Sequence, residues 1–505
     1  MSLSVSLYTA LSALDADQGA LAVTSNNIAN VNTPGYSREV AQFTESPIVT
    51  SGDLQFGTGV NLTGVQGIRD NVLQLRLDQQ AQTQGQLNTF VSGMNQVQSV
   101  FNEPAGSGLQ SAISNFYNSF QLLAADPTNL GLRQTTISDA QTLAAGFNQA
   151  AAALTAEQQS ADQGVTQTVG QINTLTAQIA SLNGQISAAA GGGQNPNSLL
   201  DQRALAVNQL SQLVDVQSIT ADSNSLTLTT KGGTLLVTGN QSFNLSTQTN
   251  AATGFQDVYA QGSDITASIQ SGNLAGYIQL RDQEVPSLTT KLDTLASGIA
   301  TTVNTQSAAG FDLNGVAGGN FFVPPAALAG AALNLSVAVT NPTNVAASGD
   351  GTPGNNANAT ALADLQNQTN IGGQTPVDYY SSIVFQVGND TANATSSLDG
   401  QNLIIQQLQD QQGAESGVSL DQEGANIVLY QNAYSAAARV AGVISTLYQT
   451  AINMGLVTTS WAAHASIRIF SRTCWLASRR FSSNSTRPIW NSPPDAASMR
   501  PPTIP

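Results

Sequence analysis

The chain has 505 residues, only 9% of them are charged, and its formal net charge is −16. Such an acidic chain is not expected to bind nucleic acid or an anionic membrane as its main partner. The mostly apolar stretch 326–339 falls short of the ~18 residues that a membrane-spanning helix needs, and no basic residue precedes Arg38. We therefore expect neither insertion into a membrane nor a cleavable signal peptide.

Residues 3–30 are predicted to form a helix. Apolar side chains recur there in steps of four, three and seven residues, which is the heptad rhythm of a helix with one apolar seam. The seam residues are Leu7, Leu11, Leu14, Leu21 and Ile28.

The helix runs into the sequence SNNIANVNTPGYSR at residues 25–38. Asparagine is a poor helix former, and the residue before a proline is disfavoured from helical backbone. Pro34 and Gly35 fit the two centre positions of a type II turn, because glycine accepts a positive φ. Extended chain should follow, so that residues 1–70 form an N-terminal helix, a turn and an extended segment.

Two interpretations of these asparagines stay open. They are either a simple helix stop, or they join neighbouring subunits through amides that donate and accept hydrogen bonds at once. The candidate interface residues of this stretch are Asn26, Asn27, Asn30, Asn32, Pro34, Gly35 and Tyr36.

The middle of the chain alternates between two patterns. Residues 71–213 carry apolar residues every three or four positions and are predicted to be helical, with the loop GGGQNPN at 191–197 between antiparallel helices. Residues 284–309 return to the same helical pattern and should pack with that domain.

The other two segments are not helical in pattern. Residues 214–283 alternate apolar and polar side chains around Gly232-Gly233, which predicts a β-rich segment with a hairpin there. Residues 310–376 form a Gly- and Asn-rich outer segment with short strands and loops.

Residues 377–459 are predicted to be helical and to end in a second seam. Its apolar residues step by three and four over nearly four heptads. The seam residues are Ile427, Tyr430, Tyr434, Ala437, Ala441, Ile444, Tyr448 and Ala451.

A narrow apolar stripe is buried best against another stripe. The two terminal helices therefore either pair as one coiled coil or dock separately on a globular core. The predicted fold is mainly α with a smaller β part: paired N- and C-terminal helices, a long helical-bundle domain and one or more β-rich outer domains.

Catalytic chemistry has little support in this chain. The only histidine and the only cysteine lie in residues 460–505, so the rest offers no catalytic triad, thiol nucleophile or zinc site. Its glycine-rich stretches lack the Lys-Ser/Thr pair of a phosphate-binding loop. A pair of carboxylates could serve a glycosidase in principle, but Asp421 and Glu423 are better explained as charges in the first turn of a helix. We expect no enzyme activity, no cofactor and no metal.

Both ends of the chain resemble one known family. SNNIANVNTPGYSR is similar to the N-terminal signature of bacterial flagellar rod, hook and hook-associated proteins. SGVSLDQEGANIVLYQNAYSAAARVAGVISTLYQTAINM resembles that family's C-terminal helix, and 292–322 resembles a stretch of its hook–filament junction proteins. The likeness covers about half of residues 1–459.

The resemblance implies a structural protein without enzyme activity. Subunits of this family leave the cell unfolded through the flagellum's own export channel and form a ring between hook and filament. Their terminal helices line the central channel, and their middle domains face outward. The implied partners are copies of the chain, the hook protein, hook-associated protein 3 and a cytoplasmic chaperone that holds the C-terminal helix before export.

Two alternatives remain. The chain could be a hook or distal rod protein with an unusual middle, and a flagellum-associated peptidoglycan hydrolase is a remote third reading.

Residues 460–505 differ from the rest in composition. They hold all three tryptophans and six of the 15 basic residues, with a single acid, Asp495. They are either a basic interaction arm or a disordered, dispensable extension produced by a shift of the reading frame.

The second interpretation has support in the codons. Back-translation of residues 479–505, read from the third base of each codon, permits VQQQLDAANMELATGRRIDAPADDP. This string resembles the start of hook-associated protein 3, as if the frame ran into the gene of a partner.

Overall fold

The computed structural model describes residues 3–51, 53–102, 107–220 and 225–455. The chain is 65% helix and 12% strand, which confirms the predicted class of a mainly α protein with a smaller β part. Its internal contacts divide it into two compact units. The first unit holds the described residues up to Gly19, residues 43–62 and the last helix from Leu429, and the second holds residues 20–42 and 63–428.

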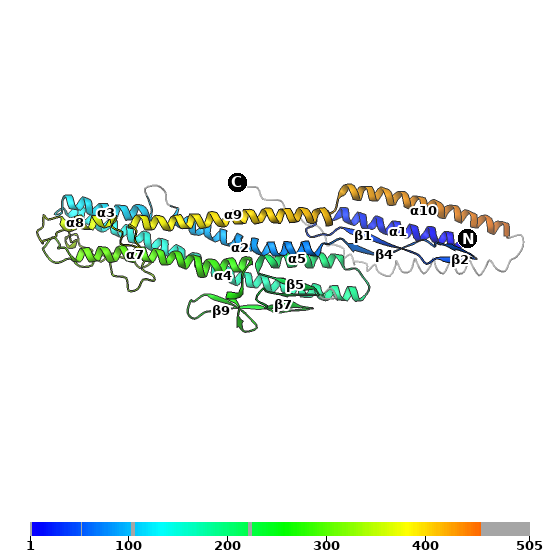
Figure 1. Cartoon of the computed structure of the whole chain (residues 1–505), viewed down its shortest axis with the longest axis horizontal. Helices are drawn as coiled ribbons and strands as arrows, with labels where there is room; N and C mark the ends of the chain where they lie inside the picture. Colours follow the sequence, from blue (N-terminus) through cyan, green and yellow to red (C-terminus); the bar gives the residue numbers. More distant parts are fainter. Residues whose placement is uncertain (1–2, 52, 103–106, 221–224, 456–505) are drawn as a thin grey trace, which may run out of the picture. The chain divides into compact units, whose positions relative to one another are not determined.

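The long helices at the two ends of the chain were both predicted. They are α1 (Leu3–Ala29) and α10 (Leu420–Gly455), and Figure 1 draws them in blue and orange. The first unit also contains the hairpin of β2 (Val49–Ser51) and β3 (Leu54–Phe56), which pair antiparallel. The strands β1 (Glu39–Glu45) and β4 (Val60–Gly67) pair as a second ribbon.

Helices dominate the second unit. They are α2 (Asn71–Phe101), α3 (Leu109–Ala125), α4 (Leu130–Gly191), α5 (Asn197–Leu213), α6 (Gly272–Gln279), η2 (Leu280–Glu284), α7 (Val285–Ala308), α8 (Ala357–Asp364) and α9 (Pro376–Ser416). Short polar side chains start several of them: the Asp70 carboxylate accepts the N–H groups of Val72 and Leu73 at α2, and Asn129 acts likewise at α4. The predicted loop at 191–197 separates α4 from α5.

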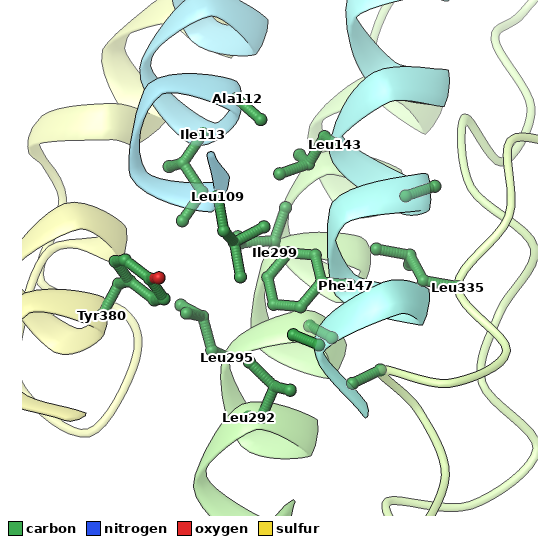
Figure 2. Packing of buried hydrophobic residues seen from close by; sticks show 14 of the residues in the cluster. Leu109, Ala112, Ile113, Leu143, Phe147, Leu292, Leu295, Ile299, Leu335 and Tyr380 are labelled. Atoms are coloured by element: carbon green, nitrogen blue, oxygen red, sulfur yellow. The ribbon is translucent and has the colours of Figure 1, made fainter. Parts of the chain in front are cut away.

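The main core of this unit fills the space between α2, α3, α4, α7 and α9. Figure 2 shows side chains of four elements meeting there, among them Ile113, Phe147, Leu295 and Tyr380. All four are at most 1% exposed. Because buried apolar area stabilises a fold by about 25 cal/mol per Å², this core holds the long helices together.

The β part of the second unit consists of two small antiparallel sheets. The first has the order β5-β6-β7-β8 and the second has the order β11-β10-β9. Their strands are β5 (Gln217–Thr220), β6 (Leu226–Thr229), β7 (Leu235–Thr238), β8 (Gln241–Ser242), β9 (Leu245–Thr249), β10 (Gln256–Ala260) and β11 (Ser263–Asp264). The predicted hairpin lies between β6 and β7, where Gly233 has φ +82°. These sheets share a second core with α5, α6 and the later part of α4.

Two short helices differ from the sequence-based expectation. The helix α6 lies inside the segment expected to be β-rich, and α8 lies in the segment expected to hold strands and loops. Each has only eight residues, which is too few for a periodic pattern to stand out. Helix α8 forms because Ala359 and Leu362 are buried in the main core.

One type of hydrogen-bonded contact recurs in the described part of the chain. A helical asparagine amide accepts the N–H and donates to the C=O of one extended residue, and we call this contact an asparagine staple. The pairs are Asn27 with Glu39, Asn173 with Leu245, Asn183 with Leu226, and Asn304 with Phe322. The amide replaces the missing strand neighbour and brings no charge into the interior.

Candidate assembly interface

The signature stretch 25–38 ends α1 in a tight turn. The N–H of Tyr36 donates to the carbonyl of Thr33 over 3.2 Å, and Gly35 has φ +78°. Both observations agree with the predicted type II turn around Pro34-Gly35. Pro34 and Gly35 are exposed.

The asparagines of this stretch bond within the chain. Asn27 is 1% exposed; besides its staple to Glu39, it accepts the Tyr36 hydroxyl at 2.8 Å. Asn26 donates to that hydroxyl and to the Glu39 carboxylate, and Asn30 donates to Asn26. Burial, together with the nearby Glu39 carboxylate, raises the pKa of Tyr36, so the hydroxyl keeps its proton and remains a donor.

These contacts bear on the interface prediction for the stretch. Asn27 is occupied inside its own chain, whereas Asn32 is exposed. A contact of Asn26, Asn30, Asn32 or the turn with another subunit stays a prediction.

The two residues after the turn connect distant parts of the second unit. Ser37 donates from its hydroxyl and its N–H to the carboxylate of Asp201 on α5, and Arg69 donates to the same carboxylate at 2.9 Å. Arg38 forms an ion pair with Glu423 at 2.7 Å, and its N–H donates to the Ser416 carbonyl.

Glu423 therefore does more than the sequence suggested. It stands in the first turn of α10, as expected, but it is 1% exposed and paired with Arg38. The signature stretch thus connects the end of α1 to the start of α10. Sequence reasoning missed Arg38 and Asp201 because nothing in the pattern pairs residues so far apart.

The most buried face of α1 consists mainly of small residues. Its members are Ala10, Ala16, Ala20, Val23, Thr24 and Asn27. Of the predicted seam, Leu11 is 47% exposed, and Leu7, Leu14, Leu21 and Ile28 are half-buried.

Small side chains let the neighbouring backbone approach closely. In the first unit, the N–H of Val60 donates to the Ser12 hydroxyl, and a Cβ at Gly59 would lie 2.1 Å from that oxygen. The buried face of α1 is therefore made mainly of small residues, which a search for large apolar side chains does not find.

The predicted seam of α10 coincides with its least exposed face. Between residues 427 and 454, every partly or fully buried side chain occupies a seam position, and Ile444 is 7% exposed. Tyr434 and Ala451 are the two seam residues that stay exposed. From Leu429 onward α10 belongs to the first unit, and with it all of the seam except Ile427.

A second stripe on α10 is exposed along its whole length. It precedes the seam by one residue at each step, which is about 100° around the helix, and we call it the outer stripe. Its residues are Leu429, Ala433, Ala436, Val440, Val443, Leu447, Thr450 and Met454. The exposed fractions reach 61% at Val443 and 70% at Met454. Such a row of exposed apolar side chains is typical of an interaction surface.

Candidate metal sites and cavities of the described residues bear on the sequence-based expectation of a chain without enzyme activity. No cluster of three or more His, Cys, Asp or Glu residues there could hold a metal ion. A cavity of about 300 Å³ lies between α2, α4 and α6, and among its lining residues Glu157 is the only carboxylate. One carboxylate does not supply the acid and base of a glycosidase. The described helices also include none that is long and apolar enough to cross a membrane.

Comparison with known proteins identifies the family. A family model described as "Flagellar hook-associated protein FlgK helical domain" matches residues 94–322, and one described as "Flagella basal body rod protein" matches residues 7–36. Flagellar hook-associated protein 1 of Bacillus subtilis (strain 168) is 30% identical over 495 residues, covering 88% of this chain and 97% of that protein. The chain belongs to the flagellar hook-associated protein 1 family.

Other members of the flagellar hook-associated protein 1 family agree. The protein of Escherichia coli (strain K12) is 27% identical over 89% of this chain and 99% of its own length. The structure of the flagellar hook junction protein FlgK from Burkholderia pseudomallei shares the fold, with a TM-score of 0.61 and 20% identity over 68% of this chain and all of that chain. The prediction of a structural protein of the flagellum, in the hook–filament region, is thereby confirmed at the level of the family.

Proposed function

We propose that this chain is a subunit of the ring that joins the flagellar hook to the filament, and that copies assemble through their terminal helices. The observation that carries this proposal is the outer stripe of α10, a row of mainly apolar side chains that are exposed among the described residues. Membership of the flagellar hook-associated protein 1 family supports it.

The proposed arrangement uses both faces of α10. The seam lies within the first unit, where α1 and α10 pair as a coiled coil, and the outer stripe meets a neighbouring copy. A helix with two apolar stripes can be buried only between two partners. The paired helices would line the central channel, with the second unit facing outward.

We propose the remaining partners because the resemblance to flagellar axial proteins implies them. They are the hook protein, hook-associated protein 3 and a cytoplasmic export chaperone on the C-terminal helix. Export through the flagellar type III pathway without a cleavable signal would place the assembled chain outside the cell. We propose that the chain acts without cofactor or catalysis, and membership of a family of structural flagellar proteins supports that part of the proposal.

A charge in the outer stripe tests the proposal. Val443→Asp should abolish junction assembly and motility, because a buried carboxylate without a partner costs several kcal/mol. The matched control is Ser445→Asp, two residues away on the exposed polar face of α10. Normal junctions with Val443→Asp, at normal amounts of exported protein, would remove the outer stripe from the assembly.

A hook or distal rod protein is the second candidate, since the rod-protein model matches residues 7–36. Immunogold labelling decides between them. Gold confined to the tip of the hook supports the junction, whereas gold along the hook or in the rod supports the alternative.

A further inference from the structure

The segment 313–349 contains no charged residue at all, in a chain whose net charge is −16. The stretch 326–339, whose apolar character stood out in the sequence, divides within it: Ala331, Ala332, Leu335 and Val339 are buried. Residues 323–330, VPPAALAG, together with Leu333, lie mostly at the surface, and we call them the apolar loop. Val323, Leu328 and Leu333 are 48%, 49% and 42% exposed.

Buried polar groups hold this loop in one shape. The carboxylate of Asp293 on α7 is 3% exposed and accepts the N–H groups of Gly330 and Ala332, both at 2.8 Å. The side-chain amide of Asn148 on α4 donates to the carbonyls of Ala332 and Leu333 at 2.8 Å.

Further contacts hold its two ends. Asn304 staples Phe322, and the N–H of Val323 donates to the Ser336 carbonyl. Leu335 is buried in the main core, to which Phe147 also belongs (Figure 2).

Folding alone does not explain why a buried carboxylate fixes an exposed apolar loop. Burying a carboxylate is unfavourable unless its hydrogen bonds compensate, and exposed apolar side chains gain nothing in water. A rigid apolar surface, however, binds a partner with little further loss of conformational entropy. The apolar loop therefore has the properties of a preformed contact surface.

The absence of charge in the apolar loop indicates which kind of partner it can bind. A basic partner would be recognised by carboxylates, and none stands within 313–349. A second copy of this chain is acidic, so most of the two surfaces repel each other. Such a copy is least repelled where the surface carries no charge. We propose that the apolar loop contacts a second copy of this chain; the proposal rests on the proposed assembly of copies and adds to it a contact by the second unit.

Cysteine cross-linking in assembled flagella tests the contact. The chain has one cysteine, Cys474, and Cys474→Ser leaves a background without thiols. In that background Leu328→Cys, labelled at its thiol with a benzophenone maleimide that links to any neighbouring C–H group on irradiation, should give a product of twice the chain mass of 52.1 kDa. Asn389→Cys, an exposed polar position on α9, is the matched control and should give none.

A third variant separates the two proposals. Val443→Cys reports contacts of the outer stripe. If it cross-links and Leu328→Cys does not, or if Leu328→Cys links to a different protein, the apolar loop is not a contact between copies and the assembly proposal stands. If neither variant cross-links, the assembly of copies fails and this inference fails with it. In the supporting case, Leu328→Asp should also lower incorporation of the chain about tenfold relative to Asn389→Asp, as expected for the loss of ~1.4 kcal/mol.

Discussion

Asp215 is a fully buried carboxylate of the second unit whose hydrogen bonds are incomplete. It is 0% exposed; one oxygen accepts the N–H of Lys231 at 3.2 Å, and the other has no hydrogen-bond partner. Burial raises the pKa of Asp215 to about 6, and burial does the same to Asp78 on α2. An aspartate in an unfolded chain has a pKa near 3.9.

The sign of the pH dependence follows. Because the folded chain holds these protons more tightly than the unfolded chain, the contribution of Asp215 and Asp78 to the free energy of unfolding is largest below about pH 4 and is lost as pH rises through about 6. A shift of two units corresponds to about 3 kcal/mol. We expect Asp215→Asn to flatten the stability profile between pH 5 and 7, measured by urea unfolding at each pH. An unchanged slope would contradict a buried, proton-binding Asp215.

The seam residue Ile444 is the most buried residue of α10 beyond Glu423. Ile444→Asp should abolish junction assembly while residues 71–375 stay folded, because the new carboxylate has no partner in an apolar seam. Tyr434→Ala, at a residue 39% exposed, should weaken assembly less. Circular dichroism and electron microscopy of the flagella provide the readouts, and normal junctions with Ile444→Asp would refute the seam.

Single residues were predictable where their effect is local. The turn at Pro34-Gly35 depends on two adjacent residues, and the sequence indicates it directly. The hydrogen bonds of Asn27 could not be predicted in the same way, because its partner Glu39 lies twelve residues away and comes close only in the folded chain. The seam leucines of α1 are half-buried or exposed within the chain, and their contact with another subunit stays a prediction.

At the scale of elements, the ion pair between Arg38 and Glu423 joins the two ends of the chain. The Glu423 side chain is only 2% exposed, and that of Arg38 is 24% exposed. Removing the cation leaves a buried carboxylate without compensation, which costs a few kcal/mol when the partner is partly solvated.

Arg38→Met should therefore loosen the start of α10. We expect faster amide exchange at residues 417–428 and a loss of about 2 kcal/mol in unfolding free energy. The double change Arg38→Met with Glu423→Leu should recover part of that loss, and Arg76→Met, at an exposed arginine of α2, serves as the control. Unaltered exchange at 417–428 would show that the ion pair does not hold the helix.

Helices longer than three turns were predictable because their apolar period repeats often enough to be recognised. The outer stripe of α10 was not predicted, because alanines and a threonine occupy several of its positions and weaken its apolar pattern. Only the exposed fractions in the structure distinguish it from the seam. The positions of the two small sheets on α4 depend on staples such as Asn183 to Leu226, which sequence periodicity does not register.

At the scale of the molecule, residues 460–505 lie outside the described residues. Alignments with the relatives use 97–99% of those proteins and 88–89% of this chain. The abrupt change in composition at residue 460 supports the proposal of a frame-shifted extension.

Deletion of residues 460–505 should leave export, junction assembly and motility unchanged. Swimming halos of cells that carry only the truncated gene measure the effect, and the nucleotide sequence shows whether the shifted frame stays open. Stop codons throughout that frame, or loss of motility on truncation, would make residues 460–505 a true part of the protein.

The asparagine staples have a consequence for the water around the protein. Dissolved ions screen interactions between exposed charges over about 8 Å at physiological ionic strength, but a hydrogen bond between neutral amides offers them nothing to screen. The attachment of Leu226, Leu245 and Phe322 to their helices should therefore be as strong in fresh water as in brine. A motile cell carries its flagellum from one medium into another, and the strength of the asparagine staples should not change with the salinity.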